Sequence, residues 1–324
     1  MSFKRSAYIA VTLFLGFLVA GCAVTTATPT LSPTPTQPAA ESIEPTATPT
    51  LMPSPTPAQS TAEPIEPTPT PMPTATPTPE ATPEIEPWTS SSPDGKWIVT
   101  GGMSEPFLEG DVEKYRTQLI VASADGAIEW TAVNESRNWG LGYTTPQVFH
   151  WSRDGRYLYF TNVAAPDGCV LFVNGSDLYR VDLVTGEVEA ILPARAWWLA
   201  LSPDEQTLAY LYWNGSALEV VLRGVESGDE KQATLPDSNE LQAGNIVWSP
   251  DGESLLLVTA RCPPRDYSIL RLDAASLKWT TLIDKNPQPI SILEWPEAGR
   301  AVLSGEDGRR WWMDAATGRI EPVD

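Results

Sequence analysis

The chain has 324 residues and a formal net charge of −20, with 41 acidic and 21 basic side chains, 32 prolines and one histidine. Such acidity argues against a nucleic acid partner, because binding to phosphate depends on clustered lysine and arginine. A single histidine also leaves few combinations for zinc binding or for a nucleophile activated by histidine. We therefore expect no nucleic acid partner, no cofactor and no metal ion.

Residues 1–21 have the layout of a secretory signal. Lys4 and Arg5 precede an apolar stretch, residues 7–20, that is too short to span a bilayer as one helix. The following Leu18-Val19-Ala20-Gly21-Cys22 resembles a bacterial lipobox. This resemblance implies lipidation of Cys22 in the short segment 22–24, whereas an ordinary signal with a chance cysteine is the alternative. We expect an exported chain, held by lipid alone on the outer-facing surface of a cell membrane.

Residues 25–87 are mainly proline, threonine, alanine, serine and glutamate, as in Pro67-Thr68-Pro69-Thr70-Pro71. A segment so poor in apolar side chains does not recover its ordering entropy by burial, and closely spaced prolines favour extended polyproline II. We predict a disordered, semi-rigid linker. Its threonine–proline pairs are also typical of O-glycosylated stalks, so glycosylation stays open.

Residues 88–324 contain a repeated phrase that introduces apolar, strand-forming runs. Its copies are Ser92-Pro93-Asp94-Gly95, Ser152-Arg153-Asp154-Gly155, Ser202-Pro203-Asp204-Glu205, Ser249-Pro250-Asp251-Gly252 and an eroded Trp295-Pro296-Glu297. The four aspartates are 60, 50 and 47 residues apart, a period typical of blades or solenoid turns. Proline fixes φ in such a turn, aspartate can accept backbone hydrogen bonds, and glycine tolerates a positive φ.

Each repeat is predicted to contain four antiparallel strands. Innermost strands are expected at 147–151 and 245–248; second strands at 97–100, 157–161, 207–212, 254–259 and 301–304; third strands at 118–122, 177–183, 217–222, 268–272 and 310–314; fourth strands at 128–132, 188–192, 232–235, 279–283 and 320–323. No clear amphipathic helix interrupts them. The pattern predicts an all-β fold, a single β-propeller of about five four-stranded blades, with six as the alternative.

A tryptophan, the Ser-Pro-Asp-Gly phrase and a later Leu-Tyr-x-Val-Asp-Leu-x-x-Gly element recur in order. The clearest copies are Trp151 to Arg156 with Leu178 to Gly186, and Trp248 to Gly252 with Leu270 to Asp273. This order resembles the WD40-like repeats of TolB-type propellers and of the propeller halves of prolyl oligopeptidase-type peptidases. The resemblance implies the fold and is nearly silent on function. TolB-type proteins have six blades behind a small mixed domain, so five repeats behind a linker argue against a TolB-like role in an outer-membrane tethering complex.

Signatures of catalysis are sparse. No Gly-x-Ser-x-Gly elbow occurs, so the hydrolase half that accompanies peptidase propellers is not indicated. The only histidine, His150, alternates with Phe149 and Trp151 on an inner strand and is predicted to have a structural role. A pair of carboxylates that cleaves glycosidic bonds is the enzymatic alternative. We predict that the protein is not an enzyme.

A ligand face is predicted at the end of the sheets opposite the Ser-x-Asp turns. Long connections emerge there, at 101–117, 133–146, 162–176 and 260–267, and long loops often carry function. The candidate residues on this face are Phe107, Glu109, Asp111, Arg137, Trp139, Tyr143, Trp197, Arg261 and Arg265. Their aromatic rings suit either a peptide or a sugar. Tryptophans that pack beneath their own loops are the structural alternative.

Cys169 and Cys262 fall in equivalent connections of the second and fourth repeats. In an exported chain they can form a disulfide, provided that their Cα atoms lie within about 7 Å, and two unpaired thiols are the alternative. Taken together, these features favour a surface-displayed, lipid-anchored binding or scaffold module for an envelope protein. A glycan-binding module is the first alternative, and a hydrolytic enzyme is the second.

Overall fold

The computed structural model describes residues 83–140, 142–164, 171–237 and 241–323. The predicted signal, Cys22, Cys169 and most of the predicted linker lie outside these residues, so those assignments stay predictions. In the described ranges the chain forms strands joined by turns and loops, without any helix. It follows that no helix there is long and apolar enough to cross a membrane.

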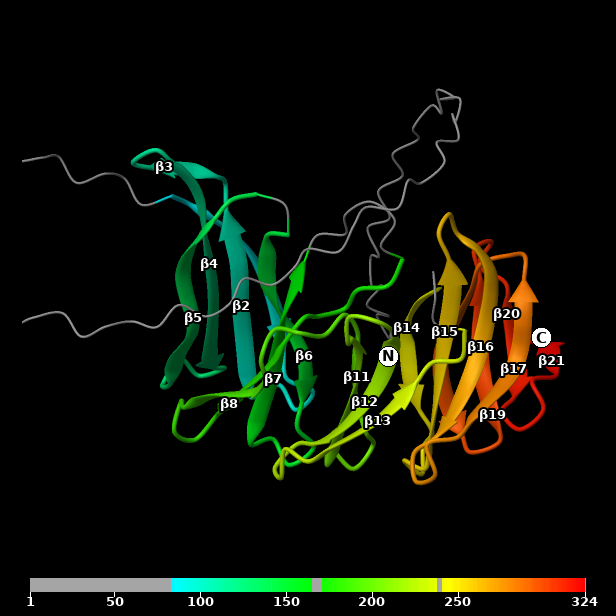
Figure 1. The fold of residues 1–324 in the computed structure, drawn as a ribbon. Helices are drawn as coiled ribbons and strands as arrows, with labels where there is room; N and C mark the ends of the chain where they lie inside the picture. Colours follow the sequence, from blue (N-terminus) through cyan, green and yellow to red (C-terminus); the bar gives the residue numbers. More distant parts are fainter. Residues whose placement is uncertain (1–82, 141, 165–170, 238–240, 324) are drawn as a thin grey trace, which may run out of the picture. The chain divides into compact units, whose positions relative to one another are not determined.

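The described strands form five antiparallel sheets, each built from consecutive strands (Figure 1). The first sheet contains β1 (Ile85–Ser91), β2 (Trp97–Ser104), β3 (Phe107–Glu109), β4 (Val112–Ser123) and β5 (Glu129–Asn138); the second contains β6 (Thr144–Trp151), β7 (Tyr157–Ala164), β8 (Leu178–Asp182) and β9 (Val188–Leu192). The third contains β10 (Leu199–Leu201), β11 (Thr207–Trp213), β12 (Leu218–Gly224) and β13 (Glu230–Thr234).

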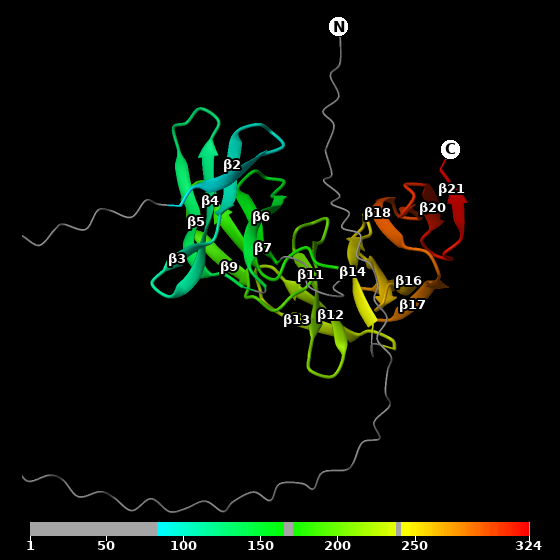
Figure 2. The same cartoon turned by 90° about the horizontal axis from the view of Figure 1, so that it is seen from above.

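The fourth sheet contains β14 (Leu241–Trp248), β15 (Ser254–Arg261), β16 (Arg265–Asp273) and β17 (Trp279–Asn286); the fifth contains β18 (Ile290–Glu297), β19 (Arg300–Gly305), β20 (Arg310–Asp314) and β21 (Ile320–Pro322). In four of the sheets the spatial order is the sequence order, as Figure 2 also shows for β18, β20 and β21. The first sheet adds the short β3, which pairs with β4. These meanders are propeller blades, so the all-β prediction and the number of repeats are confirmed.

The Ser-x-Asp turns form as the sequence predicts. In the copy before β7, Ser152 Oγ donates to Asp154 Oδ1 at 2.7 Å and accepts the backbone N–H of Tyr157 at 2.7 Å. The three other full copies repeat both bonds, at 2.6–2.7 Å and 2.9–3.0 Å. Glycine occupies the position of positive φ in three copies, and Glu205 adopts a φ of 63° in the third repeat. These local bonds join the first two strands in four of the five described sheets.

Apolar residues pack between successive sheets. Successive side chains of a strand point to opposite faces, so a continuous apolar strand contacts two neighbours. In β11, Leu208 and Tyr210 belong to the cluster with the second sheet, whereas Ala209 and Leu211 belong to the cluster with the fourth. Similar clusters join the first sheet to the second and the fourth to the fifth. The core of the described chain therefore lies between its sheets.

Each predicted strand overlaps an observed one, but the connections were predicted too long. Most of 101–117 is strand, because β2 continues to Ser104 and β4 begins at Val112. Likewise β15 and β16 extend to Arg261 and from Arg265, which leaves a short turn in place of the predicted loop 260–267. β1 begins at Ile85, within the range predicted as linker, and pairs with β2. The observed strands are thus longer than the apolar pattern of the sequence indicates.

Candidate functional site

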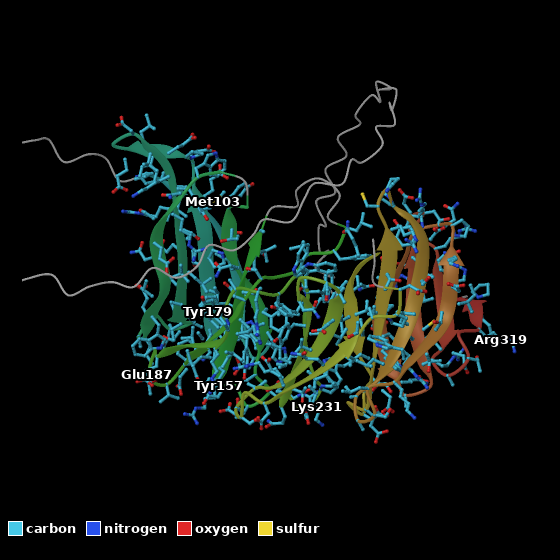
Figure 3. All side chains as sticks on the ribbon, in the orientation of Figure 1. Met103, Tyr157, Tyr179, Glu187, Lys231 and Arg319 are labelled. Carbon is cyan, nitrogen blue, oxygen red and sulfur yellow. The ribbon has the colours of Figure 1, made fainter. Side chains whose placement is uncertain are left out.

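We use the term loop end for the end of each sheet where the second strand finishes and the third begins. Figure 3 marks the two ends: Met103 lies near the end of β2, and Tyr157 starts β7 after a Ser-x-Asp turn. The predicted ligand face corresponds to the loop end. Its connections are β2–β4, β7–β8, β11–β12, β15–β16 and β19–β20 within sheets and those between successive sheets.

The first sheet carries a hairpin at its loop end. Phe107 and Glu109 lie in β3 and Asp111 in the following turn. The Glu109 carboxylate lies 2.9 Å from Nζ of Lys114, so an ion pair joins the two strands of the hairpin. Leu108, which precedes Glu109 in β3, is 66% exposed. The hairpin therefore presents an apolar side chain to solvent beside a charged pair.

An aromatic cluster follows β5 at the same end of the chain's first blade. The rings of Trp139 and Tyr143 are stacked, with centroids 4.5 Å apart and an interplanar angle of 19°. Both meet Tyr115 edge-on, at 5.8 and 6.1 Å. Tyr115 is 1% exposed, and its hydroxyl donates to the carbonyl of Thr144 and accepts its N–H, both at 3.0 Å. A buried tyrosine thus supports two half-buried rings.

Arg137 is held beside this cluster. Its Nε donates to Glu135 at 2.9 Å, and one terminal nitrogen donates to Thr144 Oγ1 at 2.7 Å and to Asn162 Oδ1 at 3.2 Å. Asn162 in turn donates to the buried carboxylate of Asp177 through its backbone and side-chain nitrogens, at 2.7 and 2.8 Å. Burial raises the pKa of Asp177, against the lowering effect of these bonds. The network fixes Arg137 across the first and second sheets.

The remaining candidates lie on other sheets. Trp197, in the connection before β10, is 47% exposed, and its backbone binds Leu211 and Asn174. Arg261 and Arg265 flank the β15–β16 turn, each 3.9 Å from Asp266. Cys262 in this turn is disulfide-bonded, and its predicted partner lies outside the described residues, so the pairing stays a prediction. The candidates are therefore spread over the first, third and fourth sheets.

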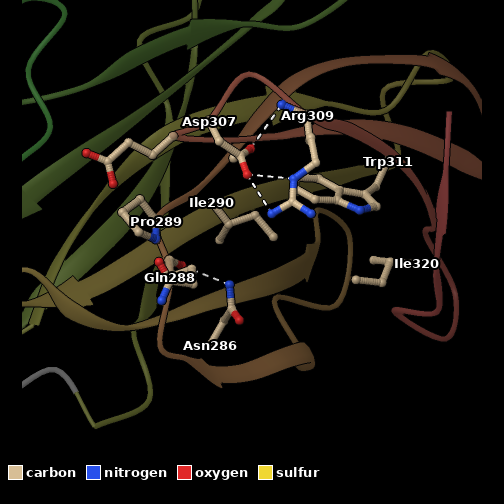
Figure 4. A pocket seen from close by; sticks show the side chains of 10 residues that line it. Asn286, Gln288, Pro289, Ile290, Asp307, Arg309, Trp311 and Ile320 are labelled. Carbon is tan, nitrogen blue, oxygen red and sulfur yellow. Dashed lines mark hydrogen bonds and ion pairs between the residues drawn. The ribbon is translucent and has the colours of Figure 1, made fainter.

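Sequence reasoning missed a pocket at the loop end of the fifth sheet. It lies between the β17–β18 connection and the β19–β20 turn and has a volume of about 450 Å³ (Figure 4). Its lining consists of Asn286, Gln288, Pro289, Ile290, Gly305, Glu306, Asp307, Arg309, Trp311 and Ile320. Both connections are short, so their length does not mark them as functional in the sequence. The one signal was Trp311, a tryptophan that the repeat pattern does not require.

A second cavity, of about 610 Å³, lies beside β8 and β9. Its arginines are paired: Arg180 contacts Glu189 at 2.7 Å and also Glu226, and Arg156 contacts Asp182 at 2.9 Å. Carboxylates thus neutralise both guanidinium groups, so this cavity does not favour an anion.

Few described residues suit catalysis. His150 Nε2 lies 2.7 Å from Oε1 of Glu205, which also accepts the N–H of Arg153 at 3.0 Å. This contact links the second sheet to the turn of the third and gives His150 a structural partner. No group of three or more histidine, cysteine, aspartate or glutamate side chains in the described ranges is arranged to hold a metal ion. Nor do those ranges contain a hydrolase domain beside the sheets.

No family model and no curated protein match the chain. Among solved structures it is similar to TolB from Acinetobacter baumannii, with 17% identity over 74% of this chain and 53% of that one and a TM-score of 0.38. It is also similar to dipeptidyl peptidase 4 from Porphyromonas gingivalis (12% identity, 72% and 38% of the chains, TM-score 0.48). A third is the β-propeller domain of the Trilobed protease from Pyrococcus furiosus (12% identity, 73% and 71% of the chains, TM-score 0.44).

This chain thus spans about half of the TolB structure and less than half of the peptidase. At such identities the likeness concerns the fold alone.

Proposed function

We propose that this protein is an exported, lipid-anchored propeller that binds a protein of the cell envelope without catalysis. The observation that carries the proposal is the aromatic cluster at the loop end, in which Tyr115 supports the stacked rings of Trp139 and Tyr143. Tryptophan, tyrosine and arginine dominate the binding energy of protein interfaces, above all when the protein holds them rigidly. Arg137, fixed by three partners beside this cluster, supplies the third of these residue types.

The surroundings of the cluster suit a protein partner better than a small molecule. Leu108 and Val112 are exposed on the hairpin of the same sheet, and Glu109 and the half-buried Lys114 form an ion pair on that hairpin. A small apolar patch with a charged rim is typical of protein interfaces. The proposed localisation at the membrane rests on the signal-like segment and on Cys22. The Pro/Thr-rich segment would hold the sheets away from the membrane.

The test is an affinity capture from detergent-solubilised native envelope, with the full chain as bait. We expect one protein in stoichiometric amount. The double variant Trp139→Ala/Tyr143→Ala should reduce its recovery at least about tenfold, because truncating a central hot spot typically costs 2 kcal/mol or more. The control is Trp312→Ala, which removes a half-buried tryptophan of the fifth sheet.

Circular dichroism and the melting temperature will establish that the double variant remains folded. Recovery of polysaccharide alone would overturn the proposal in favour of a glycan-binding module. Equal capture by the wild type and the double variant would show that the cluster is not the binding surface. The anchor is tested separately: Cys22→Ala should move the protein from the membrane fraction to the soluble fraction.

A further inference from the structure

The pocket of the fifth sheet has the size of a small-ligand site. About 450 Å³ lies within the range of 300–1,000 Å³ that is common for such sites. Its walls come from two connections at the loop end, residues 286–290 and 305–309, and from the strands that follow them. The pocket therefore opens on the end of the sheet where a ligand face is expected, but on a different blade from the aromatic cluster.

The floor of this pocket is apolar. Trp311, Ile290 and Ile320 line it, and Figure 4 shows the indole of Trp311 between Arg309 and Ile320. Gly305, the cross-strand neighbour of Arg309 in the turn, leaves room for this ring, because a Cβ atom there would lie 2.9 Å from the indole. Ile320 is 47% exposed, so the floor is in part open to water. An apolar surface that stays wet gains free energy when a ligand covers it.

The rim of the pocket is polar and fixed by its own bonds. Asp307 Oδ1 accepts the backbone N–H of Arg309 at 3.0 Å, and Oδ2 accepts its Nε at 2.5 Å. These bonds lower the pKa of Asp307, the backbone bond most strongly, so the carboxylate is ionised at neutral pH. On the opposite side, Asn286 Nδ2 donates to the carbonyl of Gln288 at 2.8 Å. The rim thus combines carboxylate acceptors with amide and guanidinium donors.

Charge narrows the class of ligand. The lining contains two carboxylates, Glu306 and Asp307, and one guanidinium, Arg309, which already pairs with Asp307. An anion would therefore meet net negative charge. A cation would compete with the guanidinium of Arg309, whose central carbon lies 5.7 Å from the Trp311 ring centroid. An entirely apolar ligand would cover the polar groups of the rim, which would lose their hydrogen bonds to water and gain none from the ligand.

A neutral sugar ring meets all of these conditions. One face of a pyranose presents C–H groups that pack on an indole, while its hydroxyls both donate and accept hydrogen bonds. We propose that the pocket lined by Trp311, Asn286 and Asp307 binds a neutral pyranose unit of a glycan. This site is independent of the proposed protein-binding cluster, and it would let one molecule contact a protein and a polysaccharide at once.

The test is a calorimetric titration of the full chain in detergent with the neutral sugars maltotriose, cellotriose, mannotriose and N,N′,N″-triacetylchitotriose, and with trigalacturonic acid as a charged sugar for comparison. Concentrations up to about 10 mM are enough to detect a dissociation constant near 1 mM. We expect at least one trisaccharide to bind. Trp311→Ala should weaken binding at least about tenfold, and Asn286→Ala several-fold, because the first removes the stacking surface and the second a hydrogen-bonding group.

Trp312→Ala is the matched control, since it removes the adjacent tryptophan, whose side chain points to the opposite face of β20. Its affinity should be unchanged. Asn286 lies at the rim, so its variant keeps the test informative if Trp311→Ala fails to fold. The proposal is overturned if no trisaccharide binds to the wild type, if Trp312→Ala weakens binding as much as Trp311→Ala, or if charged sugars bind better than neutral ones. Protein capture through Trp139 and Tyr143 is measured separately, so either proposal can fail alone.

Discussion

The turn between β20 and β21 offers a direct test of how one blade docks on the next. Gly318 has a φ of 75°, and a Cβ atom there would overlap the backbone carbonyl of Leu282 in β17. Gly308, in the β19–β20 turn, has a φ of 76° with nothing within 4 Å of such an atom. The two glycines therefore share a backbone conformation and differ in the space around them.

Gly308→Ala should cost only the conformational penalty of a left-handed alanine, roughly 1–2 kcal/mol. Gly318→Ala adds a collision with backbone, and overpacking typically costs about 1–3 kcal/mol more. Urea unfolding followed by tryptophan fluorescence measures both losses. For a domain of this size, each kcal/mol lowers the melting temperature by about 2–4 °C. Equal losses of unfolding free energy in the two variants would refute the argument that this turn packs tightly against β17 of the fourth sheet.

Three further changes test local features. Ser152→Ala should cost about 1–2 kcal/mol in urea unfolding, because the buried hydroxyl makes two hydrogen bonds, and an unchanged midpoint would contradict this role. Burial raises the pKa of the Asp177 carboxyl above 3.8, so the folded state binds the carboxyl proton more tightly than the unfolded state does. The free energy of unfolding, measured relative to that of Asp177→Asn, should therefore decrease as the pH rises from 3.8 through the raised pKa. A difference between the two proteins that stays constant or increases with pH would contradict this expectation. Cys262→Ser should lower the free energy of unfolding by about 2–4 kcal/mol, and peptide mapping without reductant should recover Cys262 joined to Cys169.

The repeated blades could be predicted because their information is local. A Ser-x-Asp turn closes within six residues, from Ser152 to Tyr157, and needs no distant partner. The apolar runs after each turn, such as β11 and β15, are buried on both faces and are therefore continuous in sequence. Continuous apolar runs and turn chemistry were enough to place the second, third and fourth strands of each repeat.

The loop end of the first sheet could not be predicted, because there the strand depends on contacts between separate segments. Gly101 and Gly102 interrupt the apolar pattern of β2 and were assigned to a loop. In the structure Gly101 lies against the ring of Trp88, so its lack of a side chain makes room for an aromatic residue of β1. The sequence alone does not distinguish a glycine that permits close packing from a glycine that ends a strand.

The support of the candidate residues and the pocket of the fifth sheet could not be predicted for a similar reason. Trp139 and Tyr143 were placed at the loop end, but their buried support, Tyr115, fell in a range assigned to a loop. The pocket around Trp311 depends on residues from five strands and two short connections, and loop length does not reveal such a convergence. Local chemistry could be deduced, whereas contact between distant segments could not.

The absence of shared strands among the five described sheets has a consequence for how such a chain changes over time. Each blade is a contiguous piece of sequence that contacts its neighbours through side chains. In such an array, stability is approximately a sum over units and nearest-neighbour interfaces. Gain or loss of a terminal unit changes one interface, whereas the same event in the middle changes two. Duplication and deletion are therefore best tolerated for a unit that contacts a single neighbour.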